Sequence, residues 1–299
     1  MKQLIEAIRN AKCVAAMTGA GVSTLCGIPD FRGPQGLYKN PDAERIFDID
    51  WFDRDPSIYY RGCRELVYGL GSFEPGPVHR ALKMLEAAGH LNGIITQNID
   101  MLHQKAGSSN VYEVHGSPIR HHCRQCGDGK SFEEIMAMIA ANGGTAQLGE
   151  PYVPRCRCGG VYKPDITFFG ESLPEEAFLR SQELAARADV MIVLGTSLTV
   201  FPAAGLPRLT LQRGGKVFIV NAQPTSLDDY AAAQQPLREL EAYLASEQWR
   251  QDFADDEAGN LPADLKRGVL SEDGIWNTLD ESRQINIRML EMVTEALRQ

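Results

Sequence analysis

Five short apolar runs constrain the fold more than any other feature of the sequence. They lie at residues 13–17, 93–96, 111–114, 190–194 and 217–220, and turn residues bound each of them. Nearly continuous apolar strands are typical of a parallel sheet covered on both faces, because both sides of each strand are then buried. The intervals accommodate helical crossovers, with helices expected at 78–88 and 175–188. The sequence therefore predicts an α/β fold with a doubly wound parallel sheet, and the runs alone leave the strand order open.

Charge and composition narrow the classes of partner. The 299 residues carry a net charge of -9, which argues against a protein that coats nucleic acid or an anionic membrane. The opening residues MKQLIEAIRN place charges where a signal peptide has its apolar core, so they predict a surface helix. No apolar run approaches the roughly 20 residues of a membrane span. Four of the seven cysteines cluster between 123 and 158, which favours a reducing compartment, and we expect a cytoplasmic protein.

Small and polar residues follow each apolar run. The segments in question are 18–21 (TGAG), 96–100 (TQNID), 115–117 (HGS), 195–197 (GTS) and Asn221. Each one alone is typical of an ordinary turn or helix cap. Ligands of open parallel sheets bind beyond the carboxyl ends of the strands, so five such ends together predict a binding site on one rim.

The stretch MTGAGVSTLCGIPDFRG (17–33) begins like a dinucleotide-binding loop and then departs from it. Gly19 and Gly21 match the first two positions of the G-x-G-x-x-G fingerprint, but Thr24 occupies the third. The two glycines are expected to let a phosphate approach the backbone. Whether the site only binds a dinucleotide or also reacts with it is left open by the loop itself.

Two cysteine pairs predict a structural zinc site. Cys123 and Cys126 form a C-x-x-C pair, and Cys156 and Cys158 form a tighter C-x-C pair, with glycine after each. Four thiolates satisfy the tetrahedral preference of zinc and leave no open position, so the metal is expected to stabilise the fold and not to catalyse. The neighbouring histidines at 121–122 are expected to be solvated rather than ligands.

Several long motifs occur along the chain in a fixed order. They are GAGVSTLCGIPDFRG (19–33), TQNIDMLHQKAG (96–107), EVHGS (113–117), the four cysteines, KPDITFFGESLP (163–174), GTSLTVFP (195–202) and IVNAQPT (219–225). In sequence and order they resemble the motifs of sirtuins, the NAD-dependent protein-lysine deacylases. The resemblance covers about residues 1–225.

The resemblance implies a division into two domains and an extension. A Rossmann-like NAD-binding large domain would comprise 1–37, 78–117 and 164–225. A helical insertion at 38–77 and a zinc module at 118–163 would together form the small domain. Residues 226–299 replace the strand and short adenine-covering loop expected after Thr225, and we expect a divergent helical extension, with 265–276 as a candidate cover for the adenine.

The resemblance also assigns site residues. His115, Asn98 and Asp100 would be catalytic, with Asp100 bonding the nicotinamide carboxamide. The cofactor contacts would be Gly19, Ala20, Gly21, Ser23, Asp30, Phe31, Arg32, Gln97, Asn98, Ile99, Asp100, Gly195, Thr196, Ser197 and Asn221. Phe168, Phe169, Gly170 and Glu171 would pair with the backbone of an acyl-lysine protein substrate as an added strand.

The chemistry implied by this family is consistent with a histidine at a strand end. Breaking the nicotinamide–ribose bond leaves an electrophilic carbon that the acyl oxygen of the substrate captures, if it is held in line. A ribose hydroxyl then attacks, and its proton needs a base, for which His115 is suited near neutral pH. Water then completes the reaction, and the products would be free lysine, nicotinamide and O-acyl-ADP-ribose.

Alternatives share the same pocket. A mono-ADP-ribosyltransferase or NAD glycohydrolase would cleave the same bond and differ only in what captures the ribose. A non-catalytic NAD-binding module has no use for a base at this place. The absence of the third glycine of the fingerprint argues against a hydride-transferring dehydrogenase. Family members that prefer acidic acyl groups have Tyr-x-x-Arg, whereas here Cys63 follows three places after Tyr60, so we expect an uncharged acyl group such as acetyl.

Overall fold

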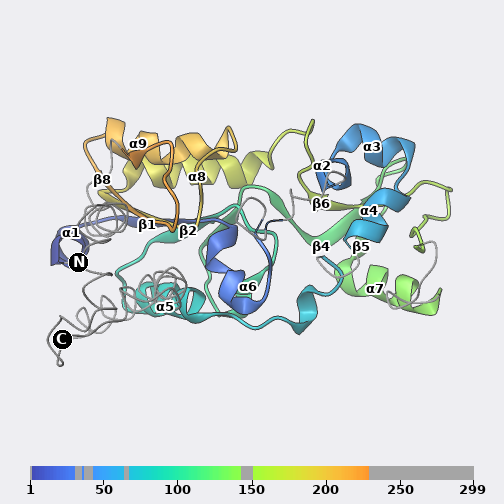
Figure 1. The fold of residues 1–299 in the computed structure, drawn as a ribbon, viewed down its shortest axis with the longest axis horizontal. Helices are drawn as coiled ribbons and strands as arrows, with labels where there is room; N and C mark the ends of the chain where they lie inside the picture. The colour runs from blue at the N-terminus through green and yellow to red at the C-terminus, as the bar shows by residue number, and fades with distance from the viewer. Residues whose placement is uncertain (1, 31–35, 37–42, 64–66, 143–150, 229–299) are drawn as a thin grey trace, which may run out of the picture.

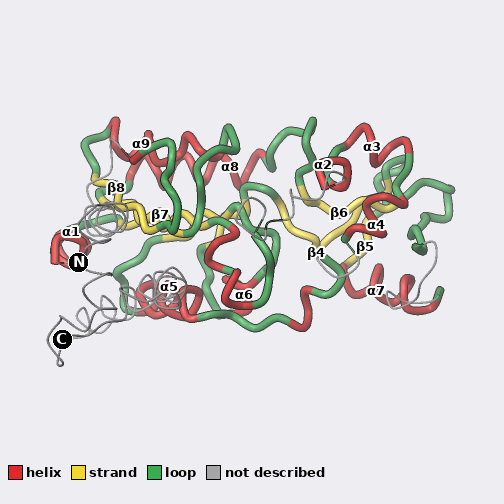
Figure 2. Tube along the Cα trace, in the orientation of Figure 1, coloured by secondary structure: helices red, strands yellow, loops and turns green. Residues whose placement is uncertain are grey.

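The computed structural model describes residues 2–30, 36, 43–63, 67–142 and 151–228. Within them the chain forms a five-stranded and a three-stranded sheet that lie side by side along the long axis of the molecule (Figures 1 and 2). No helix of the described part of the chain combines the length and apolarity needed to cross a bilayer.

The five predicted runs are the five strands of the larger sheet. The strands are β1 (Val14–Thr18), β2 (Gly93–Thr96), β3 (Val111–Glu113), β7 (Val190–Leu194) and β8 (Lys216–Val220). All neighbours pair in parallel, in the order β3-β2-β1-β7-β8. This order confirms the Rossmann-like sheet and places its topological switch point between β1 and β7, where ligands of such sheets bind.

Helices cover both faces of this sheet (Figure 1). Alternate residues of β1 point to opposite faces. One face packs against α1 (Lys2–Asn10) and α5 (Pro77–Ala87), the other against α8 (Glu175–Arg187) and α9 (Leu206–Gln212). Every residue of β1, β2 and β7 is buried, which is why these strands read as continuous apolar runs.

The smaller sheet is antiparallel and differs in its sequence pattern. Its order is β5-β4-β6, with bounds Gly129–Ser131, Gly116–Cys123 and Tyr162–Ile166. Helix α7 (Phe132–Ala141) follows β5 and begins with a capping box in which Ser131 and Glu134 bond each other's backbone N–H. Residues of β4 alternate between buried and exposed over much of its length, as expected for a sheet with one solvated face.

Three short helices of the helical insertion join the smaller sheet through aromatic packing. They are α2 (Ala43–Ile46), α3 (Ile49–Arg54) and α4 (Ser57–Gly62). A further short helix outside the insertion, α6 (Leu102–Lys105), comes after strand β2 along the chain. The ring of Phe168 packs edge-on against Phe47 and Phe52, with centroid distances of 5.8 and 5.5 Å. Arg124, beside the cysteines, bonds Asp53 of α3 through Nε at 3.0 Å and Nη2 at 2.6 Å. The domain bounds given above stay predictions, and the extension from 229 onward lies outside the described residues.

Candidate active site

A cavity of about 990 Å³ lies at the carboxyl ends of the central strands and extends to the smaller sheet. It lies at the switch point between β1 and β7, as expected for a ligand site of this sheet. The following predicted site residues line it together: Gly19, Ala20, Gly21, Asp30, Gln97, Asn98, Ile99, His115, Phe168, Phe169, Gly170, Glu171, Gly195, Thr196, Ser197 and Asn221. Residues that span two hundred positions of sequence thus meet in one cavity large enough for an extended ligand.

Four further predicted residues do not appear in this lining. Ser23 and Asp100 are buried behind it, where Ser23 bonds the lining residue Asn98 and Asp100 bonds Ser23. Phe31 and Arg32 lie outside the described residues.

His115 is held in a defined tautomer. It follows β3, and its Nδ1 lies 3.0 Å from the carbonyl oxygen of Gln97, which can only accept, so Nδ1 carries the proton. The other nitrogen, Nε2, is buried and has no hydrogen-bond partner among the described residues. Burial lowers the pKa of His115 below its ordinary value, against the opposing effect of the Gln97 carbonyl. The ring is therefore neutral at pH 7, with a free lone pair on Nε2 that can accept a proton.

A buried hydrogen-bond network supports the wall beside His115. Ser23 Oγ donates to Asp100 Oδ2 at 2.6 Å and accepts from Asn98 Nδ2 at 3.1 Å. Asp100 Oδ1 accepts the backbone N–H of Leu102 at 3.0 Å. Both carboxylate oxygens of Asp100 are thus engaged within the protein, and its predicted contact with a carboxamide stays a prediction. The network fixes the orientation of the Asn98 side chain at the cavity.

Two buried histidines lie beneath this network. His79 Nδ1 accepts the Gly76 N–H at 3.2 Å, so it caps the start of α5, and its Nε2 lies 3.5 Å from Ser23 Oγ. The rings of His79 and His103 are 4.7 Å apart. Burial lowers the pKa of His103 to about 3, and that of His79 is also lowered by burial, against the effect of the Asp100 carboxylate. His79 therefore caps α5, and both histidine rings pack in the buried interior.

Gly19 and Gly21 have a packing role in addition to the phosphate approach that was predicted for them, which stays a prediction. The N–H of Gly19 donates to the carbonyl of Leu194, and that of Gly21 to the carbonyl of Gly195, so neither is free for a phosphate. A Cβ on Gly19 would lie 2.6 Å from the side chain of Thr196, and a Cβ on Gly21 would lie 2.8 Å from Gly195 Cα. The glycines are required because the loops after β1 and β7 pack backbone to backbone.

The segment 168–171 already pairs with the chain itself. Phe169 N donates to the carbonyl of Phe47 at 2.7 Å, and Phe169 O accepts the N–H of Ile49 at 3.1 Å. The N–H of Phe168 donates to the Glu171 carboxylate at 2.9 Å. These groups are used, so strand addition by a substrate would require the remaining backbone groups of the segment.

Reasoning from the sequence predicted Phe169 but missed three other apolar side chains at the rim of the cavity, those of Leu25, Leu179 and Phe201. Leu25, Phe169, Leu179 and Phe201 line the cavity and are among the exposed large apolar residues of the described chain. Leu179 comes from α8, a helix assigned to the sheet cover alone. In the sequence, Leu179 is only a single apolar residue on the otherwise polar side of an amphipathic helix. Single exposed apolar residues are common on protein surfaces, so this one did not indicate a cavity.

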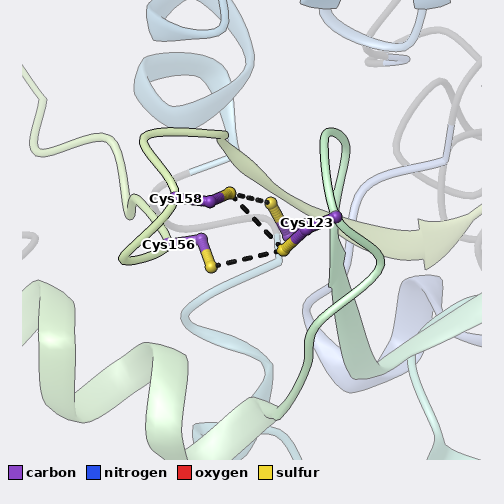
Figure 3. A group of neighbouring side chains, drawn as sticks. Cys123, Cys156 and Cys158 are labelled. Atoms are coloured by element: carbon purple, nitrogen blue, oxygen red, sulfur yellow. Dashed lines mark hydrogen bonds between the residues drawn. The ribbon is translucent and has the colours of Figure 1, made fainter.

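The four cysteines converge at the end of β4 (Figure 3). Their Sγ atoms lie within 4.8 Å of one another, with separations of 3.4 Å for Cys123–Cys158, 3.6 Å for Cys126–Cys156 and 3.4 Å for Cys126–Cys158. A zinc ion with Zn–S bonds of about 2.3 Å implies Sγ separations of about 3.8 Å. A disulfide needs about 2.05 Å, so the arrangement fits a structural zinc ion and not a disulfide.

The histidines beside the cysteines have separate partners. His121 is buried, contrary to the expectation that both are solvated, and its Nε2 lies 3.1 Å from the Tyr68 hydroxyl. It packs near Phe132 of α7 because its place on β4 faces the aromatic core. His122 is exposed and pairs with Asp165 at 2.6 Å. Among the described residues, only the four cysteines form a group that could hold a metal.

Comparison with known proteins agrees with this geometry. The model of the Sir2 family matches residues 19–202. The NAD-dependent protein deacetylase of Thermotoga maritima is 40% identical over 232 residues, which cover 77% of this chain and 90% of that protein. The NAD-dependent protein deacylase 2 of Archaeoglobus fulgidus is 38% identical over 230 residues, with coverage of 76% and 87%. A family of unknown function, DUF4298, matches residues 219–292.

Solved structures with the same fold contain the expected ligands. A Sir2 structure with a deacetylated p53 peptide and 3′-O-acetyl ADP-ribose superimposes with a TM-score of 0.72 at 39% identity, covering 78% of this chain and 91% of that one. A Sir2 structure with a p53 peptide and NAD⁺ gives a TM-score of 0.69 at 37% identity, with coverage of 82% and 99%. A Sir2 structure with a propionylated peptide gives 0.69 at 37%, with coverage of 78% and 91%. The family match, the relatives and the shared fold together show that the chain belongs to the Sir2 family.

Proposed function

We propose that this protein is an NAD-dependent protein-lysine deacylase that releases nicotinamide, O-acyl-ADP-ribose and free lysine. The observation that carries the proposal is His115, which lines the cavity with a neutral ring and an unpartnered Nε2. The loops 97–99 and 195–197 line the same cavity, at the place where a Rossmann-like sheet binds a dinucleotide. The relatives with deacetylase and deacylase names support the same assignment.

When bound, NAD supplies a ribose carbon that becomes electrophilic as nicotinamide leaves. The chain's own residues supply position and a base. Nδ1–H of His115 donates to the Gln97 carbonyl, which fixes the ring and leaves Nε2 to take a proton from a ribose hydroxyl. Gln97 Nε2 in turn donates to Thr196 Oγ1 at 2.9 Å and so ties the loops after β2 and β7 together.

The acyl group is proposed to be uncharged. The described part of the cavity wall contains the acidic residues Asp30, Glu171 and Glu175 and no lysine or arginine. An acidic acyl chain would meet like charge there, and the Lys163 ammonium beside the wall is already paired with Glu171 at 2.7 Å. Tyr60 and Cys63 are both buried in the aromatic cluster, with the Tyr60 hydroxyl bonded to the carbonyl of Tyr162 at 2.6 Å. Acetyl and propionyl groups meet no such conflict.

The test uses the purified chain with NAD and matched acetyl-, propionyl- and succinyl-lysine peptides, read by mass spectrometry. The proposal predicts deacylated peptide and nicotinamide in equal amounts, with succinyl-lysine at least about tenfold slower. A mass gain of one ADP-ribose on protein or peptide would instead indicate an ADP-ribosyltransferase. Nicotinamide release independent of peptide would indicate an NAD glycohydrolase. Faster succinyl turnover would contradict the acyl preference alone.

We propose a cytoplasmic location, and the four clustered cysteines support it. Zinc-binding thiols need a reducing compartment, which supports a cytoplasmic location. Acyl-lysine proteins or peptides are the proposed partners, and the net charge of -9 disfavours direct binding to nucleic acid or anionic membranes. Fractionation of the source cells tests the location. Detection of the protein in the cytosolic fraction would support the proposal, and detection in a membrane or secreted fraction would contradict it.

A further inference from the structure

Lys163 is a buried charge that the proposed chemistry does not use. It lies on β6 and is only 7% exposed. Its Nζ donates to the carbonyl of Ile166 at 2.7 Å and to that of Pro164 at 3.1 Å, and it forms an ion pair with Glu171 Oε2 at 2.7 Å. A lysine ammonium has three donors, so all three are satisfied here. Burial lowers the pKa of Lys163 below its ordinary value, against the stabilising effect of Glu171.

The partners of Lys163 form one wall of the cavity. Ile166, Phe168 and Glu171 all line it, and the ammonium also lies 4.0 Å from the ring centroid of Phe168. Glu171 Oε2 additionally accepts the backbone N–H of Phe168 at 2.9 Å. The buried Lys163 ammonium therefore contacts the carbonyls of Pro164 and Ile166, the ring of Phe168 and the carboxylate of Glu171.

The same segment joins two parts of the small domain. Phe169 bonds through its backbone to Phe47 and Ile49, while Phe168 packs on the aromatic rings of the helical insertion. Lys163 reaches this segment from the sheet that carries the cysteines. A charged side chain is costly to bury unless it is fully bonded, and here the bonds all converge on the wall of the site.

We propose that Lys163 is a positioning residue that holds segment 166–171 in the conformation that receives the acyl-lysine. It acts through Glu171 and the carbonyls of Pro164 and Ile166, and does not touch the reacting atoms. The proposal rests on the proposed deacylase function. It predicts a separation of effects, because the NAD-lining loops at 19–21, 97–99 and 195–197 make no contact with Lys163 among its described bonds.

The experiment compares Lys163→Met, Glu171→Gln and the double variant in the full chain, with Lys105→Met as a matched control. Lys105 likewise pairs with a glutamate, Glu74 at 2.8 Å, and donates to a backbone carbonyl, that of Phe73 at 2.6 Å. These three residues do not line the cavity, so the substitution tests loss of a similar set of bonds elsewhere. We expect Lys163→Met to raise the KM for acetyl-lysine peptide about tenfold or more while the KM for NAD changes less than about twofold. Lys105→Met should leave both constants unchanged.

Two further readouts separate positioning from general damage. Because Lys163 acts through Glu171, the double variant should raise the peptide KM no more than the larger single effect does. Hydrogen exchange should accelerate at the amides of 167–171 in both single variants, with β1 unaffected and zinc content unchanged. The exchange measurement needs no activity, and Glu171→Gln carries it if Lys163→Met does not fold.

The outcomes are distinct. Any one of three results would overturn the inference. They are an unchanged peptide KM in folded, zinc-loaded Lys163→Met, multiplicative effects on the peptide KM in the double variant, and unaltered hydrogen exchange at 167–171. A wild-type chain that does not deacylate any peptide would overturn the proposed function instead, and the exchange result would still decide whether Lys163 holds the segment.

Discussion

The two sheets of this protein are stabilised in different ways. In the larger sheet, β1, β2 and β7 are buried at every residue and helices pack on both faces. In the smaller sheet, β4 has one exposed side and ends at a cysteine of the metal site. Apolar burial therefore accounts for one sheet, whereas the other depends on four thiols and an aromatic cluster. His115 lies where β3 of the first sheet passes into β4 of the second.

The largest expected effect is loss of the metal. Zinc binding contributes directly to folding when the ligands are brought together only in the folded state. We expect verified zinc removal, or Cys158→Ser, to expose β4 and β6 to rapid hydrogen exchange while β1 and β7 stay protected. Mass spectrometry of exchanged peptides measures this difference between the sheets. Protection of β4 and β6 that survives complete zinc removal would show that the sheets do not differ in this way.

The larger sheet should respond to a cavity instead. Ile192 lies in β7, an inner strand of the larger sheet, with 0% exposure. Ile192→Ala is expected to lower the free energy of unfolding by about 2–5 kcal/mol, because buried methyl groups are removed and their space is only partly refilled. Chemical denaturation measures the change. Leu179→Ala, at 53% exposure, is the control and should change the free energy by less than about 0.5 kcal/mol. Similar costs at both positions would contradict the burial argument.

A third prediction concerns acid sensitivity of the larger sheet. The pKa of His103 is lowered to about 3 by burial, whereas the unfolded chain has an ordinary histidine pKa of about 6.5. Between these values the unfolded state binds one more proton, so stability falls as the pH falls. His103→Gln should reduce the slope of unfolding free energy against pH by about 1.4 kcal/mol per unit below pH 6.

Denaturant titrations from about pH 5 to about pH 8, roughly 1.5 units either side of the ordinary histidine pKa, measure this slope. Gln retains a polar group that can reach Thr18, whose Oγ1 lies 2.9 Å from His103 Nε2. Identical slopes for the variant and the wild type would show that His103 is not held neutral.

The smallest expected effect lies at the contact between α3 and the cysteines. Arg124 and Asp53 form a bidentate pair with 40% and 48% of their side chains exposed. Exposed pairs contribute about 0.2–1 kcal/mol and are weakened by salt. A double-mutant cycle with Arg124→Gln and Asp53→Asn should give a coupling in this range that falls at high salt. A coupling of several kcal/mol would mean that this pair, and not the metal, holds the small domain together.

The contrast between the sheets also explains what the sequence could predict. Apolar runs identified the five strands of the larger sheet, most clearly β1, β2 and β7, because a strand that is buried at every residue reads as a continuous apolar run. The cysteine spacing predicted the metal site, since thiol pairs have few other uses. The pairing of Gly19 and Gly21 with Gly195 was not predictable, because it depends on how close two loops approach. Nor was Lys163, since a lysine in sequence is nearly always solvated and only its buried partners reveal its place.

The candidate site also has a part that the sequence predicts and a part that it does not. Residues at strand ends, such as His115 and Asn98, were placed by topology, because parallel strands bring their carboxyl ends to one rim. The layer behind the cavity, where Ser23 bonds Asp100, depends on side-chain geometry that no sequence pattern encodes.

The central claim is that His115 acts as a base after nicotinamide has left. The most direct test supplies wild type and His115→Ala with NAD, isotope-labelled nicotinamide and an acetyl-lysine peptide, and follows both deacetylation and label exchange into NAD. The account predicts that the variant loses deacetylation by a factor of about 10² to 10⁴ but still exchanges nicotinamide, because the step before the base is intact. Deacetylation that persists in the variant, or exchange and deacetylation that are lost together in a folded protein, would contradict it.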